Sequence, residues 1–211
     1  MSNIDDLVES LSRDAVSVKP VPHPVMLCAI WTGCALAYIA VALMLSGLRP
    51  DLIHKLHEPI FLSEIAVLAA MFFSASMSAA TLSFPDLHQM PRAALSPMLV
   101  FILLLIILYV AWRADIPPAA LPRHSFECTF SIMVFSVLPA VWMITQMRKL
   151  ACTHQRMAGC VAMLAAFSVG ALWLRLYEQN DSVLHVAEWH YLPMLAFSVT
   201  GLWLGKRALK W

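Results

Sequence analysis

Residues 94–112 read ALSPMLVFILLLIILYVAW, a stretch without a single charged side chain. A helix of about 20 apolar residues crosses the ~30 Å hydrocarbon core of a bilayer. A helix is also the expected form, because a segment in lipid must satisfy its own backbone hydrogen bonds. This stretch therefore predicts a transmembrane α-helix.

Five more apolar runs accompany it, each bounded by proline, glycine or charged residues. The six predicted spans are residues 24–47, 59–84, 94–112, 126–147, 156–176 and 185–205. Because the loops between them are short, successive helices should pack as antiparallel neighbours. The sequence predicts an all-α membrane protein in which six transmembrane helices form an antiparallel bundle with short loops.

The composition excludes several classes of protein. Of the 211 residues, 61% are hydrophobic and 13% are charged, whereas about 25% charged residues is usual in a soluble domain. A soluble globular domain, a disordered chain and a nucleic-acid-binding surface are excluded, so we expect membrane lipid as a partner and no direct contact with nucleic acid. The spans leave no room for a separate catalytic domain, and we expect neither an enzyme nor a cofactor. The oligomeric state is not determined by the sequence.

Three regions are expected along the chain. Residues 1–23 form a tail, residues 24–205 form the transmembrane domain, and residues 206–211 form a short end. The tail is acidic and has no basic segment leading into an apolar run, so it is not a signal peptide. Nine Lys and Arg residues lie on the side of the two termini and five on the other side. The positive-inside rule then places both termini in the cytoplasm.

The tail carries a short amphipathic helix. One helical face is formed by Ile4, Leu7, Val8 and Leu11. A proline-rich spacer follows at residues 19–24, which cannot be helical. Interfacial membrane helices are usually rich in Lys and Arg, whereas this helix carries acidic residues that anionic lipid would repel. A protein partner is favoured over a position on the membrane surface, which stays the alternative.

Small residues recur every four positions in two of the predicted spans. In the fifth span they are Ala158, Ala162, Ala166 and Gly170; in the second span they are Ala66, Ala70, Ser74 and Ser78. Such stripes let helix backbones approach closely in lipid. We expect them to be packing surfaces.

Polar side chains gather on the predicted outer side, and several are of types that bind transition metals. They are His54, His57, Glu58, Glu64, Glu127, Cys128, Glu178, Asp181, His185, Glu188 and His190. Their spacing forms no strict motif, so a solvated rim and a metal or redox-sensing site are both open. If the fifth loop folds over the fourth span, Cys128 is a candidate metal ligand together with His185, Glu188 or His190.

Several short motifs carry a resemblance to a known family. They are Asp5-Asp6-Leu7, Lys19-Pro20-Val21-Pro22, Cys128-Thr129-Phe130, Arg156-Met157-Ala158-Gly159 and Asp181-Ser182. With six spans and no domain between them, the chain resembles the NrsF-type proteins, the "negative regulator of sigma F" membrane proteins long catalogued in bacteria as a domain of unknown function. The resemblance implies an inner-membrane anti-sigma factor. Its cytoplasmic N-terminal segment would hold an extracytoplasmic-function sigma factor until a stress signal arrives.

The resemblance also implies roles for particular residues. The sigma-factor contact falls on Asp5, Asp6 and Leu7, and helical spacing adds Ile4 and Leu11. The family has paired cysteines implicated in sensing metal or oxidant stress, and Cys128 matches the first. The second is expected about 50 residues later, where this chain has Tyr177-Glu178. A disulfide between these two sites is therefore impossible here, although Cys128 remains a sensing candidate.

Two alternatives come from other classes of protein. One is a membrane redox or cofactor-binding protein that uses the outer His, Glu and Cys side chains. The other is a small transporter. Transporters usually carry several ionisable residues along a path through the membrane, whereas Glu64 is the only acidic residue clearly inside a predicted span.

Overall fold

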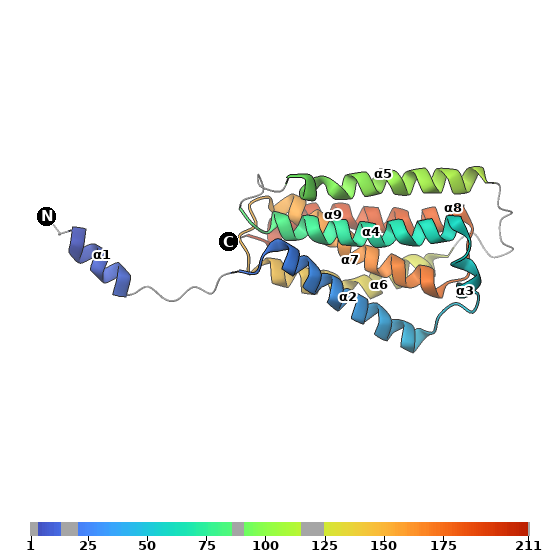
Figure 1. Cartoon of the computed structure of the whole chain (residues 1–211), viewed down its shortest axis with the longest axis horizontal. Helices are drawn as coiled ribbons and strands as arrows, with labels where there is room; N and C mark the ends of the chain where they lie inside the picture. The colour runs from blue at the N-terminus through green and yellow to red at the C-terminus, as the bar shows by residue number, and fades with distance from the viewer. Residues whose placement is uncertain (1–3, 14–20, 86–90, 115–124, 211) are drawn as a thin grey trace.

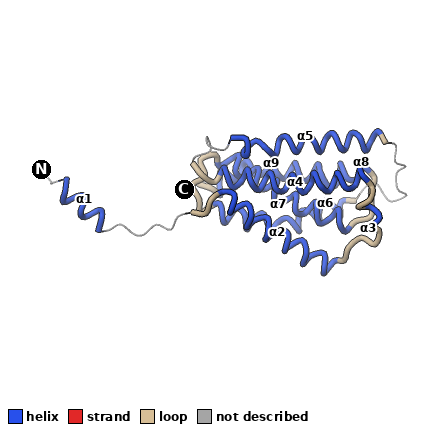
Figure 2. The backbone as a smooth tube through the Cα atoms, in the orientation of Figure 1, coloured by secondary structure: helices blue, strands red, loops and turns tan. Residues whose placement is uncertain are grey.

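The computed structural model describes residues 4–13, 21–85, 91–114 and 125–210 (Figure 1). Within these ranges the chain consists of helices and loops (Figure 2). The helices are α1 (Ile4–Arg13), α2 (Pro24–Ser46), α3 (Leu52–Lys55), α4 (Pro59–Leu82), α5 (Pro91–Arg113), α6 (Phe126–Met147), α7 (Gln155–Tyr177), α8 (Val183–Val186), the π-helical turn η2 (Ala187–Tyr191) and α9 (Leu192–Ala208).

Five of these helices, α2, α4, α5, α6 and α7, are long and apolar enough to cross a membrane. Their ends lie within three residues of the first five predicted spans. Three of them begin at a proline, which suits the first helical turn because the missing N–H would have no partner there. The apolar runs therefore predicted both the type and the limits of these helices.

The sixth predicted span is divided into α8, η2 and α9, which follow one another without a break. Pro193 has no amide hydrogen, so it leaves the carbonyl oxygen of Trp189 without its usual helical donor. The hydroxyl of Thr129 in α6 donates to this oxygen instead, at 2.9 Å. The N–H of Leu192 bonds to the carbonyl of Ala187, five residues earlier, which is the π-helical pattern. Proline thus explains why this segment departs from a regular α-helix.

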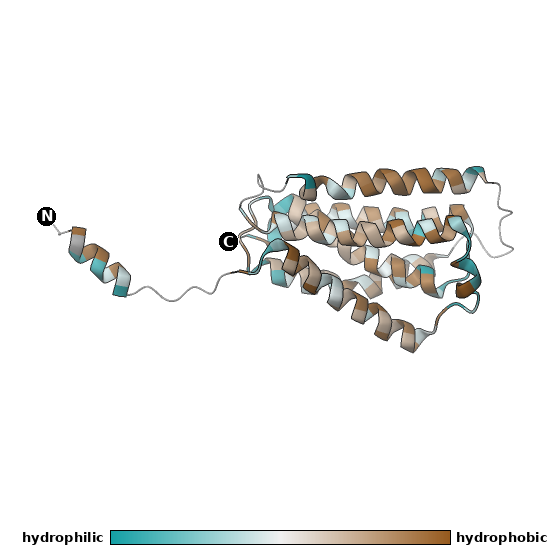
Figure 3. Cartoon of the chain, in the orientation of Figure 1, coloured by the Kyte–Doolittle hydropathy of each residue, from teal (hydrophilic) through white to brown (hydrophobic). Residues whose placement is uncertain are grey.

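The helix α7 lies at the centre of the bundle and packs against α2, α4, α6 and α9. Of its most apolar stretch, 72% of the residues are buried, compared with 11% in α5. The helix α5 packs mainly on α4 and is hydrophobic along most of its length (Figure 3). Many of its large apolar side chains are exposed, among them Leu99, Ile102 and Tyr109. The helix α7 therefore forms the centre of the bundle and α5 lies at its periphery.

The two small-residue stripes differ in burial. The whole stripe of α7, from Ala158 to Gly170, is buried. In α4, Ser74 and Ser78 are buried, but Ala66 is exposed and Ala70 is half-buried. Residues four apart drift by about 40° per step around an α-helix. The drift carries one end of the α4 stripe away from its neighbours, whereas α7 has neighbours on every side.

The closest helix packing joins α7 and α9. A Cβ atom at Gly159 would overlap the carbonyl oxygen of Gly201 and the Cα of Gly205. Only glycine at these positions allows the two backbones to come so near. The contact anchors α9, and with it η2, against the central helix.

Candidate functional site

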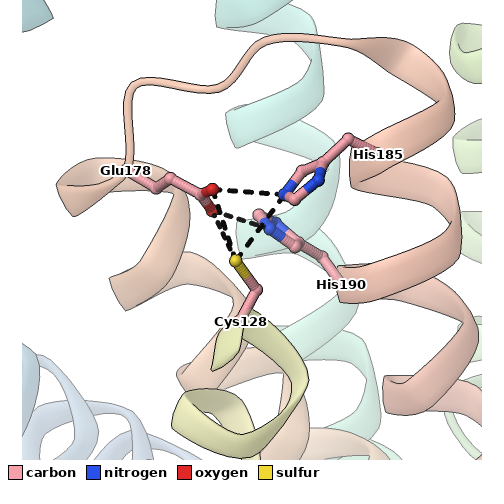
Figure 4. A group of neighbouring side chains, drawn as sticks. All are labelled: Cys128, Glu178, His185 and His190. Atoms are coloured by element: carbon pink, nitrogen blue, oxygen red, sulfur yellow. Dashed lines mark hydrogen bonds and ion pairs between the residues drawn. The ribbon is translucent and has the colours of Figure 1, made fainter. Parts of the chain in front are cut away.

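Four side chains of metal-binding types meet at the end of the bundle that carries α3 and α8, called here the α3–α8 end (Figure 4). Cys128 lies in the first turn of α6 and Glu178 directly follows α7. His185 comes from α8 and His190 from η2. One donor atom of each lies within 4.8 Å of all the others. These four residues are named the donor cluster.

The carboxylate of Glu178 is the centre of the donor cluster. The Cys128 thiol donates to its two oxygens, at 3.3 and 3.4 Å. The Nε2 atom of His185 lies 3.1 Å from one oxygen, and that of His190 lies 2.9 Å from the other. Cys128 Sγ is also 3.6 Å from His185 Nε2. Both imidazoles are fully buried.

The π-helical turn explains why two histidines five residues apart share one face. In a regular α-helix, residues five apart would point about 140° away from each other. Closing the turn with an i→i+5 bond widens it, so that His185 and His190 both face Cys128 and Glu178. Thr129, next to Cys128, holds this turn against α6 through its bond to Trp189.

The structure brings together three of the four predicted ligands, Cys128, His185 and His190. It leaves out Glu188, which is exposed on η2 because the wide turn directs it away from the two histidines. Glu178 takes the fourth place. The signal that pointed to it was its position, since it stands where the family resemblance places the second cysteine.

Beside the donor cluster lies a network of buried and half-buried charges that the sequence patterns did not predict. Its centre is Asp181. Arg49 donates one hydrogen bond to each oxygen of this carboxylate, at 2.9 Å, and Arg175 donates two to Oδ1, at 3.3 Å. The Nζ atom of Lys55 lies 3.1 Å from Oδ2. Arg49 lies 2.9 Å from Asp181, and Arg175 lies 3.3 Å from it. The guanidinium groups of both arginines also lie over the ring of Phe61, at 5.2 and 5.1 Å.

The network continues into the bundle through Glu64. Its carboxylate accepts hydrogen bonds from Arg175 at 3.0 and 2.9 Å and another from the hydroxyl of Tyr191. Arg49 also pairs with Asp51, at 2.8 Å. Arg49 and Arg175 are each only 2% exposed, so these charges are stabilised by their partners rather than by water. The seven residues Arg49, Asp51, Lys55, Glu64, Arg175, Asp181 and Tyr191 are named the ionic network.

Glu178 and Asp181, the two carboxylates of the loop between α7 and α8, are held in the charged form. Burial opposes ionisation of Asp181, but the hydrogen bond from Arg49 and the charge of Arg175 outweigh it and lower its pKa to about 2. Burial likewise opposes ionisation of Glu178, and His190, followed by Cys128, outweighs it and lowers its pKa below the usual value. An ionised Glu178 is the form that binds a cation.

A cavity of about 440 Å³ opens beside the donor cluster. Its lining consists of Leu48, Arg49, Pro50, Ser125, Tyr177, Glu178, Gln179, Asn180 and His185. Two of the four donors, Glu178 and His185, therefore border a space large enough for a hydrated ion. Of the other predicted outer residues, His54, His57 and Glu127 are exposed, while Glu58 is half-buried and pairs with Lys55 at 3.0 Å.

At the other end of the molecule, α1 is drawn apart from the bundle (Figure 1). Every side chain that the structure describes in α1 is exposed, including Ile4, Leu7 and Leu11 of the predicted partner surface. Asp6 is exposed as well, while the side chain of Asp5 is outside the described residues. Residues 19 and 20 of the predicted spacer are also outside them.

Comparison with known families gives a match over nearly the whole chain. The family described as "Negative regulator of sigma F" matches residues 11–211. The chain belongs to the NrsF family. The description of the family indicates a negative regulator and implies a sigma factor as partner. Of the predicted sigma-factor contacts, Leu11 lies inside the matched range and the other four precede it. No curated protein and no solved structure matches the chain.

Proposed function

We propose that this NrsF-family protein is an inner-membrane anti-sigma factor. It holds an extracytoplasmic-function sigma factor through its N-terminal segment and releases it on envelope stress. Two observations together support the proposal: the family match, and the exposed amphipathic helix α1 near the N-terminus. Its apolar face is not covered by any other described part of the chain.

The proposed topology has six membrane crossings in an antiparallel bundle. The sixth crossing combines α8, η2 and α9, which together run from Val183 to Ala208. At 1.5 Å per residue this segment is about 40 Å long, enough for a bilayer core. Residues 1–23 and 206–211 then lie in the cytoplasm, residues 24–205 form the transmembrane domain, and the α3–α8 end faces the periplasm.

The apolar face of α1 is the proposed sigma-factor contact, formed by Ile4, Leu7 and Leu11 with Asp5 and Asp6 beside them. Leu7 and Leu11 are 57% and 63% exposed. An isolated helix of ten residues is marginal in water, so burial of this face by a partner would stabilise it. The acidic side chains favour a partner groove with a basic border.

Charge substitutions on this face test the contact. Burying one leucine contributes about 1.5–3 kcal/mol, so Leu7→Asp or Leu11→Asp should weaken sigma-factor binding roughly tenfold or more. Co-purification of the sigma factor with the full-length protein in detergent measures the effect. Ser10→Asp adds the same charge to α1 away from the apolar face and should leave binding unchanged. Capture that survives both leucine substitutions would contradict this contact.

Reporter fusions test the topology independently. A reporter that works only in the periplasm should be active when it is fused near Lys55 or Asp181. A reporter that works only in the cytoplasm should be active when it is fused near Cys152 or at the C-terminus. Activity of the periplasmic reporter at the C-terminus would contradict the topology with six crossings.

The proposed stress input is the donor cluster, with Cys128 as the sensing residue and metal or oxidant as the signal. It lies at the end of the bundle opposite α1 (Figure 1). Input and output are therefore on the two sides of the membrane in the proposed topology.

A further inference from the structure

The donor cluster offers one sulfur, two imidazole nitrogens and one carboxylate. Cys, His and Glu in a set of four are typical of zinc sites. The contacts of Glu178 with the other three, and of Cys128 with His185, measure 2.9 to 3.6 Å. A tetrahedral site with bonds of about 2.0–2.3 Å has donor atoms roughly 3.3–3.8 Å apart. These four contacts therefore need to lengthen by only a few tenths of an ångström to surround an ion, and the donor atom of His190 lies no more than 4.8 Å from those of Cys128 and His185.

A second observation points to a missing ligand. The Nε2 atom of His190, which faces the other donors, is buried and makes no aligned hydrogen bond among the described residues, although it lies 2.9 Å from an oxygen of Glu178. Buried polar atoms are nearly always satisfied. A cation at the centre of the cluster would bind the Nε2 lone pair directly.

We propose that Cys128, Glu178, His185 and His190 form a four-coordinate site for a divalent cation of the zinc type, and that this ion, rather than a disulfide, is the signal this chain receives. The regulatory half of this inference rests on the proposed anti-sigma function; the site itself does not.

The charges of the donors fit a divalent ion. On binding, Cys128 loses its proton to solvent and becomes a thiolate, and Glu178 is already a carboxylate. With two neutral imidazoles the donors carry two negative charges, which a divalent cation neutralises. One proton is released for each ion bound, and no oxidation or reduction takes place.

The types of donor atom also favour a zinc-type ion over copper ions. Soft ions such as Cu(I) favour sites rich in thiolate or thioether sulfur, and this cluster contains one sulfur. In blue-copper sites the fourth ligand is weak and distant, whereas Glu178 approaches each other donor at 3.4 Å or less. Oxidation of Cys128 cannot form the disulfide that the family resemblance implies, since Glu178 stands where the partner thiol would be needed.

The surroundings support binding by holding the loop that carries Glu178. Three residues later, Asp181 is fixed by Arg49 and Arg175. The hydrogen bond of Thr129 with Trp189 fixes η2 against α6. The donors are thus placed by helices and ion pairs before an ion arrives, and the adjoining cavity leads to Glu178 and His185.

Metal titration of the full-length protein in detergent tests the site. Purified, metal-free protein should bind one Zn²⁺, measured by competition with a chromogenic chelator. Bound Co²⁺ should show the intense visible bands of tetrahedral cobalt and a sulfur-to-cobalt charge-transfer band. Cys128→Ser should remove the charge-transfer band and weaken binding at least tenfold, and the nearly isosteric Glu178→Gln should weaken it similarly.

Glu188→Gln is the matched control, because Glu188 lies on the same helical segment but outside the donor cluster. It should bind Zn²⁺ like the unmodified protein. Absence of stoichiometric binding, binding unchanged by both Cys128→Ser and Glu178→Gln, or equal weakening by Glu188→Gln would overturn the site. Preferential binding of Cu⁺ over Zn²⁺ would overturn the assigned class of ion.

A second readout separates this inference from the proposed function. Zn²⁺ should release a co-purified sigma factor from the unmodified protein, but not from Glu178→Gln. The variant Leu7→Asp should lose the sigma factor and still bind Zn²⁺. If Zn²⁺ binds but the sigma factor stays, the regulatory half is wrong and the site stands. If the unmodified protein captures no sigma factor, the proposed function fails and the titration still decides the site.

Discussion

The ionic network and the donor cluster lie side by side at the α3–α8 end, joined by the loop from Glu178 to Asp181, yet they differ in how their polar groups are paired. In the ionic network, carboxylates and cations alternate, and each buried arginine meets two carboxylates. In the donor cluster, one carboxylate faces a thiol and two imidazoles, and His190 has a nitrogen without a hydrogen bond among the described residues. The first group is complete as it stands, whereas a cation would complete the second.

This difference assigns different tasks to the two groups. Buried ion pairs bring little net stability, but removal of one partner leaves an uncompensated charge that strongly destabilises the fold. The ionic network therefore fixes the geometry of the α3–α8 end. The donor cluster keeps free binding capacity, which a sensing site requires. Variants that break one group and spare the other test this separation.

The largest effect is expected from Arg175→Met. It leaves Glu64 buried without its two hydrogen bonds from the guanidinium group and should lower the free energy of unfolding by about 3–5 kcal/mol. Unfolding in mixed detergent and SDS micelles, followed by circular dichroism, measures the loss. Arg148→Met removes an exposed arginine and should change stability by less than about 0.5 kcal/mol.

A double variant shows whether the unpaired charge is the cause. Glu64→Leu combined with Arg175→Met removes both charges and should recover part of the loss. If the double variant is as unstable as the sum of the two single variants, the two residues are not energetically coupled, and the account of the ionic network is wrong.

A smaller effect is expected from Glu178→Cys, which changes the donor cluster and leaves the ionic network intact. The new thiol would stand beside Cys128, as in the paired cysteines that the family resemblance implies. Under oxidant the two should form a disulfide, which typically stabilises a protein by about 2–4 kcal/mol. Thiol counting and mobility on non-reducing gels detect the bond.

The unmodified protein and Cys128→Ser/Glu178→Cys are the controls, and neither should form this disulfide. If Glu178→Cys stays fully reduced under oxidant, the two positions are not close enough to bond. The geometry of the donor cluster would then be in error.

The sequence predicted the helices better than the polar sites, for physical reasons. Apolar runs such as residues 94–112 determine a helix locally, and proline and charge limit their ends. The drift of a four-residue stripe around α4 is also local, but its burial depends on which neighbours surround the helix. For this reason the stripe with Ala158 was predicted fully and the stripe with Ala66 only in part.

The donor cluster depends on a feature that a regular helical period does not contain. With α-helical spacing, His185 and Glu188 share a face and His190 does not; the π-helical turn reverses this arrangement. Pro193 is the local signal for the irregularity, but proline is equally compatible with a kink. The ionic network joins residues more than 100 positions apart, such as Arg175 and Glu64, so only the tertiary structure reveals it.

The smallest effect is expected on mild acidification, because Asp181, the centre of the ionic network, should stay ionised between pH 7 and pH 5. The folded-state pKa of Asp181 is about 2, below its ordinary value of 3.8. A lowered pKa means that the ionised carboxylate is stabilised by folding, so its contribution is complete above pH 3.8 and is lost as the pH falls through about 2. The Tm difference between the metal-free protein and its Asp181→Asn variant should therefore stay constant from pH 7 to pH 5. It should narrow only as the pH falls from about 4 toward 2. Other groups titrate in both proteins and cancel in this difference. If the Tm difference disappears between pH 7 and pH 5, Asp181 is not held in its ionised form by Arg49 and Arg175. The account of Asp181 as the centre of the ionic network would then be wrong.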